Sequence, residues 1–186
     1  MATFGALLIY AAFFLVLLLL IRQRATQRPT QQLPKGTLRQ YTSTFNYGDD
    51  VFEDSIAIET STGEFLGEMG LNISATAGVG DPNKVTAIDF WTFDRDTIHT
   101  HTKVLMTPYC YNDPTLRQEL ALKGEAVLAT QGLTLTLPET RFTAEAHITK
   151  IELAPGPKGQ DSVFAQLKVD IVAKQRIDNT ALQLAT

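Results

Sequence analysis

The sequence contains a single cysteine, Cys110, which excludes any disulfide within the chain. It has no Cys-x-x-Cys pair, no haem-attachment motif and no Gly-x-Ser-x-Gly nucleophile turn. Gly78–Pro82 lacks the third glycine or the Lys-Ser/Thr pair of a phosphate-binding loop, so we interpret it as a turn that needs glycine. No base lies near Cys110 in the sequence, and we expect a packed, unreactive thiol. We therefore predict no catalytic residue and no cofactor.

Basic residues are scarce after the first 48 positions. The chain has 16 Lys and Arg against 20 Asp and Glu, a net charge of −4. Five of the basic residues precede the first acid, Asp49, which leaves 11 basic and 20 acidic residues, or −9, in residues 49–186. Such a surface repels phosphate backbones, so we expect no nucleic-acid partner. It is also repelled by an anionic membrane.

The first 21 residues contain no charged side chain at all. At about 1.5 Å per residue, Ala2–Ile21 is long enough to cross a hydrocarbon core of about 30 Å. The segment lacks the basic start and the cleavage site of a signal peptide, so we predict a retained transmembrane helix over residues 1–21. Without ionisable residues it offers no haem ligand or proton path. Small residues that favour close packing of a second helix are Gly5, Ala6, Ala11 and Ala12, although simple lipid anchoring explains them equally well.

Positive charge follows this apolar segment immediately. The five basic residues before Asp49 are Arg22, Arg24, Arg28, Lys35 and Arg39. The positive-inside rule then places the N-terminus outside the cell membrane and the C-terminal domain in the cytoplasm, which the lack of disulfides also favours. We expect Arg22, Arg24 and Arg28 to contact lipid headgroups.

The remaining chain divides by composition into three parts. Residues 22–48 are rich in Gln, Thr and Pro and predict a basic stalk. Residues 49–174 carry recurrent period-two alternation and predict a β-rich domain. Residues 175–186 indicate a flexible tail.

Several strands follow from the alternation. Residues 52–73 predict a hairpin around the turn Ser61–Gly63, and Val85–Phe93, apolar on both faces, predicts a central strand. A turn at Asp94–Asp96 leads to a strand over Ile98–Met106.

One helix is expected in the second half, capped by Asn112 or Asp113, with Pro114 in its first turn and Gly124 at its end. Ala126–Thr130 and Leu133–Leu137 predict a second hairpin. The last two strands are expected over residues 142–151, with a bulge near Lys150, and over residues 163–171. About eight strands and one helix indicate an antiparallel β-sandwich or barrel.

His99 and His101 lie two positions apart on one expected strand, so both project from the same face beside Lys103. Two imidazoles on one face are the beginning of a metal site, and His147 or a carboxylate would have to complete it through folding. The opposite face of the strand is the apolar one, so a solvated histidine pair is the alternative interpretation.

A resemblance to other proteins rests on three segments within Gly67–Ala129: Gly78–Ala87, Phe93–Met106 and Lys123–Ala129. Over this third of the chain the sequence resembles single-span membrane proteins of green non-sulfur (Chloroflexus-type) bacteria, for which no activity is known. The resemblance implies a bacterial membrane-attached protein. Because some of these bacteria are phototrophs, it also implies an accessory role beside a photosynthetic or respiratory complex.

These observations lead to one main hypothesis. It is a membrane-anchored, noncatalytic interaction protein, an accessory or scaffolding subunit whose partners are the lipid bilayer and other membrane protein subunits. Two alternatives stay open: a membrane-tethered sensor of a ligand or metal, and an enzyme whose site is assembled only by folding.

Overall fold

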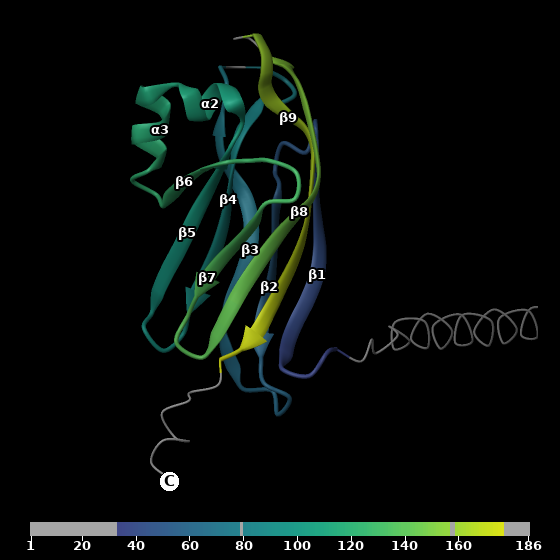
Figure 1. Ribbon diagram of the computed structural model, residues 1–186, viewed down its shortest axis with the longest axis vertical. Coiled ribbons are helices and arrows are strands. Elements are labelled where there is room, and N and C mark those ends of the chain that lie inside the picture. Colours follow the sequence, from purple (N-terminus) through teal and green to yellow (C-terminus); the bar gives the residue numbers. More distant parts are fainter. Residues whose placement is uncertain (1–32, 79, 157–158, 177–186) are drawn as a thin grey trace, which may run out of the picture. The chain divides into compact units, whose positions relative to one another are not determined.

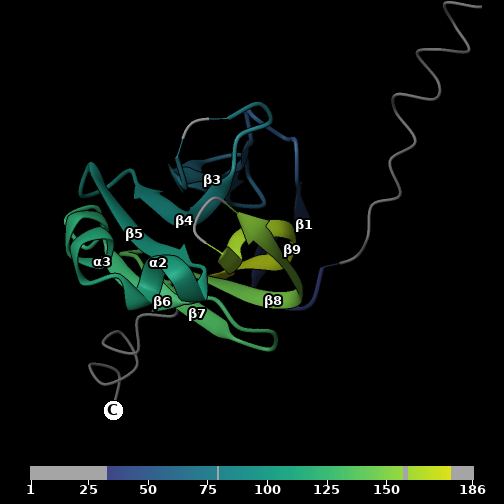
Figure 2. The same ribbon diagram turned by 90° about the horizontal axis from the view of Figure 1, so that it is seen from above.

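The computed structural model describes residues 33–78, 80–156 and 159–176, which form two β-sheets packed face to face with two short helices (Figures 1 and 2). One sheet has four strands in the order β1-β9-β8-β7, and the other has five in the order β2-β3-β4-β5-β6. The mainly β prediction is confirmed, and two separate sheets make the fold a sandwich rather than a barrel. The strands are β1 (Thr37–Asn46), β2 (Glu53–Glu59), β3 (Phe65–Thr76), β4 (Val85–Asp94), β5 (His99–Met106), β6 (Glu125–Leu128), β7 (Thr134–Pro138), β8 (Phe142–Gly156) and β9 (Gly159–Gln175).

Strand β1 corrects the predicted stalk, because its ten residues lie within residues 22–48. It pairs antiparallel with β9 and places Phe45 in the core. The sequence of β1 does not show the apolar–polar alternation of a half-buried strand, because one of its inward-pointing residues is the polar Ser43, which is fully buried. Its hydroxyl donates a 2.5 Å hydrogen bond to Asp54 Oδ2 on β2. Such a partner, eleven residues away, is invisible to local patterning.

The hairpin expectations were partly right. The β2–β3 and β4–β5 hairpins are confirmed, and the register shift between Ile148 and Lys150 on β8 confirms the expected bulge. The predicted hairpin over residues 126–137 is wrong. There β6 pairs parallel with β5 in one sheet, whereas β7 pairs with β8 in the other. The turn at Gly132, with φ of +83°, therefore carries the chain from one sheet to the other.

Two short helices make the connection that a parallel pair of strands requires. Helix α3 (Pro114–Leu120) begins as predicted: Asp113 accepts hydrogen bonds from the backbone N–H groups of Thr115 and Leu116, and Pro114 opens the first turn. It ends at Leu120, before the predicted Gly124. Helix α2 (Pro108–Asn112), capped by Thr107, was not predicted. Both helices cover the outer face of the five-stranded sheet (Figure 2).

The main core lies between the two sheets. Its largest fully buried side chains include Phe45, Phe90, Phe142 and Phe164. A smaller cluster under the helices contains Ala87, Val104, Met106, Cys110 and Leu120. Both faces of β4 and β5 are therefore covered at the helical end, which agrees with the apolar pattern of Val85–Phe93.

The strands of the sandwich run between two ends, which we call proximal and distal. The proximal end, where β1 begins, comprises residues 33–39, 59–64, 94–98, 139–141 and 175–176 (Figure 1). The distal end carries the loops 47–52 and 80–84, joined where the backbone N–H of Asn83 donates a 2.6 Å hydrogen bond to Asp50 Oδ1.

No helix within the described residues is long and apolar enough to cross a membrane. The predicted span over residues 1–21 and most of the predicted tail lie outside the described residues.

Candidate functional site

The histidine pair lies at the proximal end, on the first residues of β5. The His101 imidazole Nδ1 is 3.0 Å from both carboxylate oxygens of Glu139, which follows β7 in the opposite sheet. His99 is exposed, and its ring meets that of His101 edge to face at 4.8 Å. Both histidines are solvent-exposed, as the solvated-pair alternative expects, and His101 remains 48% exposed although folding places the Glu139 carboxylate beside it.

That carboxylate does not complete a metal centre. Within the part of the chain that the structure describes, no three His, Cys, Asp or Glu side chains gather in a way that could hold a metal ion. His147, the other suggested ligand, lies on β8 with Nδ1 3.0 Å from the Thr134 hydroxyl. The metal site predicted at His99 and His101 thus has no third ligand among the described residues.

Glu139 is the residue that sequence reasoning missed. Its side chain is almost fully buried, at 2% exposure, and it also accepts a hydrogen bond from the Thr92 hydroxyl on β4. Its backbone carbonyl accepts a 2.6 Å hydrogen bond from Arg176. A buried carboxylate needs such partners because an unpaired charge is costly away from water.

A second buried carboxylate, Asp94, lies nearby at the end of β4. Its Oδ2 accepts hydrogen bonds from the Thr140 hydroxyl at 2.5 Å and from the Thr140 backbone N–H at 2.9 Å. Its Oδ1 accepts another from the Asp96 backbone N–H. Burial by itself raises the pKa of Asp94, but these hydrogen bonds outweigh it and the pKa is lowered. Asp94 thus holds the 139–141 turn against the β4–β5 hairpin, to which Asp94 itself belongs.

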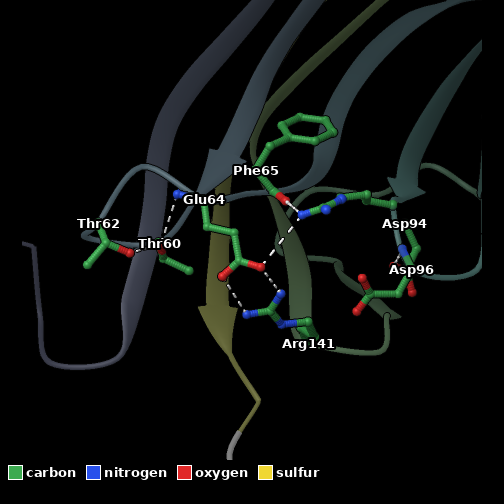
Figure 3. Close-up of polar contacts among 8 residues, drawn as sticks. Thr60, Thr62, Glu64, Phe65, Asp94, Asp96 and Arg141 are labelled. Atoms are coloured by element: carbon green, nitrogen blue, oxygen red, sulfur yellow. Dashed lines mark hydrogen bonds and ion pairs between the residues drawn. The ribbon is translucent and has the colours of Figure 1, made fainter.

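Around these buried groups, arginines join the turns at the surface (Figure 3). Arg141 forms a bidentate pair with Glu64, with N–O distances of 2.6 and 3.0 Å, and Arg95 approaches the same carboxylate at 3.6 Å. These arginines lower the pKa of Glu64, chiefly through the Arg141 hydrogen bond. Arg39 on β1 pairs with Glu59 on β2 at 3.0 Å. Individually such exposed pairs stabilise little, but together they link β1, β2 and three turns at one end.

The balance of exposed charge at the proximal end differs from that of the domain. Two acids at this end, Asp94 and Glu139, are buried, and three others are exposed or half-exposed: Glu59, Glu64 and Asp96. Five exposed or half-exposed basic residues surround them: Lys35, Arg39, Arg95, Arg141 and Arg176. With the two buried acids counted, five basic residues meet five acids, so this end is close to neutral whereas residues 49–186 as a whole carry −9.

The cysteine and the glycine turn have the environments that the sequence indicated. Cys110 is buried, and loss of hydration together with the Asp113 carboxylate raises the pKa of its thiol to about 11, which makes a nucleophilic role unfavourable. Gly78 has φ of +78°, and a strand rather than a helix follows its loop. The predicted helix-packing residues (Gly5, Ala6, Ala11 and Ala12) and headgroup contacts (Arg22, Arg24 and Arg28) lie outside the described residues.

Comparison with known proteins adds no assignment. No protein-family profile, curated protein or solved structure matches this chain.

One further buried acid, Asp89, lies on the outer face of β4. It is 8% exposed, and its Oδ1 has no hydrogen-bond partner among the described residues. Burial raises the pKa of Asp89, and the nearby Ser74, Lys123 and Asn72 side chains offset this only in part. The pKa of Asp89 is raised and that of Asp94 is lowered, so we expect the two acids to change stability with pH in opposite directions.

We predict that Asp94→Ala lowers the free energy of unfolding by about 2–3 kcal/mol near pH 7, because charge-assisted hydrogen bonds are lost. The lowered pKa means that the folded state binds fewer protons, so this stabilisation is complete above about pH 4 and declines as the pH falls through the lowered pKa. Urea unfolding of the full chain in detergent, followed by Trp91 fluorescence, measures it. Asp96→Ala, an exposed neighbour, is the control. An equal loss in both variants would contradict the assignment.

For Asp89→Asn we predict a gain in stability near pH 7 and the opposite pH dependence. The raised pKa means that the folded state binds more protons, so the wild type loses stability as the pH rises from about 4 through the raised pKa. The variant should be more stable than the wild type near pH 7, by on the order of 1 kcal/mol, and no more stable at about pH 3. The same unfolding measurement at both pH values tests this, with Asp96→Asn as control. A variant less stable at neutral pH would show that the Asp89 charge is needed.

Proposed function

We propose that this chain is a membrane-anchored, noncatalytic interaction protein, an accessory subunit that presents its β-sandwich to a larger membrane complex on the cytoplasmic side. Its N-terminal apolar segment holds it in the bilayer, and its distal end meets a second protein. The single observation that carries the proposal is a shallow groove at the distal end, lined by apolar side chains and by carboxylates.

This distal groove has a volume of about 280 Å³ and is lined by Asp50, Val51, Phe52, Glu53, Asn72 and Ile73. Val51 is 94% exposed, and the loop that bears it is fixed by the Asp50–Asn83 hydrogen bond. Tyr47, in the same loop, is also exposed. An apolar side chain on a fixed loop, beside carboxylates, suits a partner with an apolar anchor flanked by basic residues.

The proximal cluster supports a noncatalytic role. Asp94 and Glu139 use their oxygens to join turns of the two sheets, and His101 is engaged by Glu139. The Cys110 thiol, on the buried face of helix α2, has a raised pKa and completes the set of reactive groups considered from the sequence. The buried acids and His101 therefore stabilise the contact between the two sheets within the described fold.

The proposal predicts that wild-type chain extracted from its own membranes in mild detergent elutes in a complex larger than the 20.5 kDa chain with its micelle. Val51→Asp should reduce the co-eluting partner by about tenfold or more, because a central apolar contact is replaced by a charge. Leu122→Asp is the matched control, since Leu122 is 89% exposed but lies outside the groove. Size-exclusion chromatography with mass spectrometry measures both. Elution of the wild type as a monomer would contradict the subunit role.

A further inference from the structure

We propose that residues 121–124, which join helix α3 to β6, form a strap that closes over Asp89 and is released when this acid is ionised. The strap is a conformational device that depends neither on the proposed membrane anchor nor on the distal groove. Three observations support it: the path of the strap across the five-stranded sheet, the unpaired carboxylate oxygen beneath it, and the small buried surface of helix α3.

The strap contacts the sheet at two points on different strands. Gly124 lies directly against β5, because a Cβ atom at this position would be 2.1 Å from the backbone carbonyl oxygen of Thr102. The Lys123 ammonium donates hydrogen bonds to the backbone carbonyl of Ser74 on β3 at 2.9 Å and to its hydroxyl at 3.3 Å. Strand β4 lies between β5 and β3, so the Lys123 side chain crosses it.

Strand register places Asp89 at this crossing. Thr102 on β5 pairs with Trp91 on β4, and the residues on either side of Ser74 on β3 pair with residues 88 and 87. Because side chains alternate along a strand, Asp89 is the outward side chain between these two points. The Lys123 side chain therefore passes over Asp89, and its positive charge acts on that carboxylate.

The closed strap leaves Asp89 incompletely hydrogen-bonded. This residue is 8% exposed, and its Oδ1 has no partner among the described residues. The charged group that faces it is Lys123; Asn72 and Ser74 on β3 are uncharged, and its cross-strand partner on β5 is the apolar Val104. An ionised carboxylate without its full set of hydrogen bonds is costly away from water.

This cost gives the strap its response to pH. Burial raises the pKa of Asp89 in spite of the nearby ammonium, so the closed strap favours the protonated acid. An open strap hydrates Asp89 and returns its pKa towards the ordinary value. The open state therefore binds fewer protons, and its population rises as the pH increases from about 4 through the raised pKa.

Helix α3 offers little resistance to this movement. Of its seven residues only Leu120 is buried. The strap residues Ala121, Leu122 and Lys123 are all exposed, and Leu122 is 89% exposed. Segments that bury little apolar surface open locally at a lower free energy than the core. The strap can therefore lift while the two sheets stay folded.

Trp91, the single tryptophan of the chain, reports on the strap because it lies two residues from Asp89 and pairs with Thr102 beneath Gly124. The test is acrylamide quenching of the full chain in mild detergent. We expect the quenching constant of the wild type to rise about twofold between about pH 4 and about pH 7, because ionisation of Asp89 opens the strap.

Three variants complete this test. Asp89→Asn should keep Trp91 protected at both pH values, because no charge forms beneath the strap. Lys123→Met retains a long side chain but loses the ammonium, and it should raise quenching at both pH values. Lys150→Met, which removes an exposed lysine paired with Glu152 on the other sheet, is the matched control and should behave as the wild type. Equal quenching in the wild type and Asp89→Asn at both pH values would overturn the inference.

Hydrogen exchange with mass spectrometry separates strap opening from a general loss of stability. At about pH 7 we expect amides of residues 114–124 in the wild type to exchange while those of β8 stay protected. Exchange of residues 114–124 only together with β8 would show that Asp89 acts on the whole fold, and would overturn the strap. Neither measurement needs a partner, so elution of the chain as a monomer would contradict the proposed function and leave this inference standing.

Discussion

The proximal end depends on the burial of two carboxylates between the sheets. Asp94 belongs to the five-stranded sheet and takes its main partner, Thr140, from the four-stranded sheet. Glu139 belongs to the four-stranded side and takes Thr92 and His101 from the five-stranded sheet. Each acid thus takes hydrogen bonds from the opposite sheet, and loss of those partners while the acid stayed buried would leave an uncompensated charge. Apolar packing alone is non-directional, whereas these bonds fix how the two layers meet.

This arrangement also places basic residues beside the buried acids. The turns that carry the acids bring Arg95 and Arg141 to the proximal end, β1 adds Arg39, and Arg176 follows β9. Together with Lys35 these basic residues balance the five acids of the same end. The negative charge of the domain therefore lies mainly outside the proximal end, and net charge does not describe what each end of the fold presents.

Local patterning predicted those parts of the fold that local chemistry determines. The turns at Ser61–Gly63 and Asp94–Asp96, the Asp113 cap and the bulge near Lys150 all follow from neighbouring residues. The errors share a different cause. Strand β1 hides its alternation because a serine is satisfied by an acid on another strand. Gly132 marks a tight turn, but nothing in its neighbours says that the flanking strands belong to different sheets.

The candidate site, too, could be predicted only where its residues are neighbours in the sequence. The shared face of His99 and His101 could be predicted from their spacing, but Glu139 could not, because 38 residues separate it from His101. Its turn, Pro138–Arg141, carries no motif that indicates burial. Only the pairing of β7 with β8 and the stacking of the sheets place a carboxylate there. A single sequence therefore does not reveal which polar residues become partners when they are far apart along the chain.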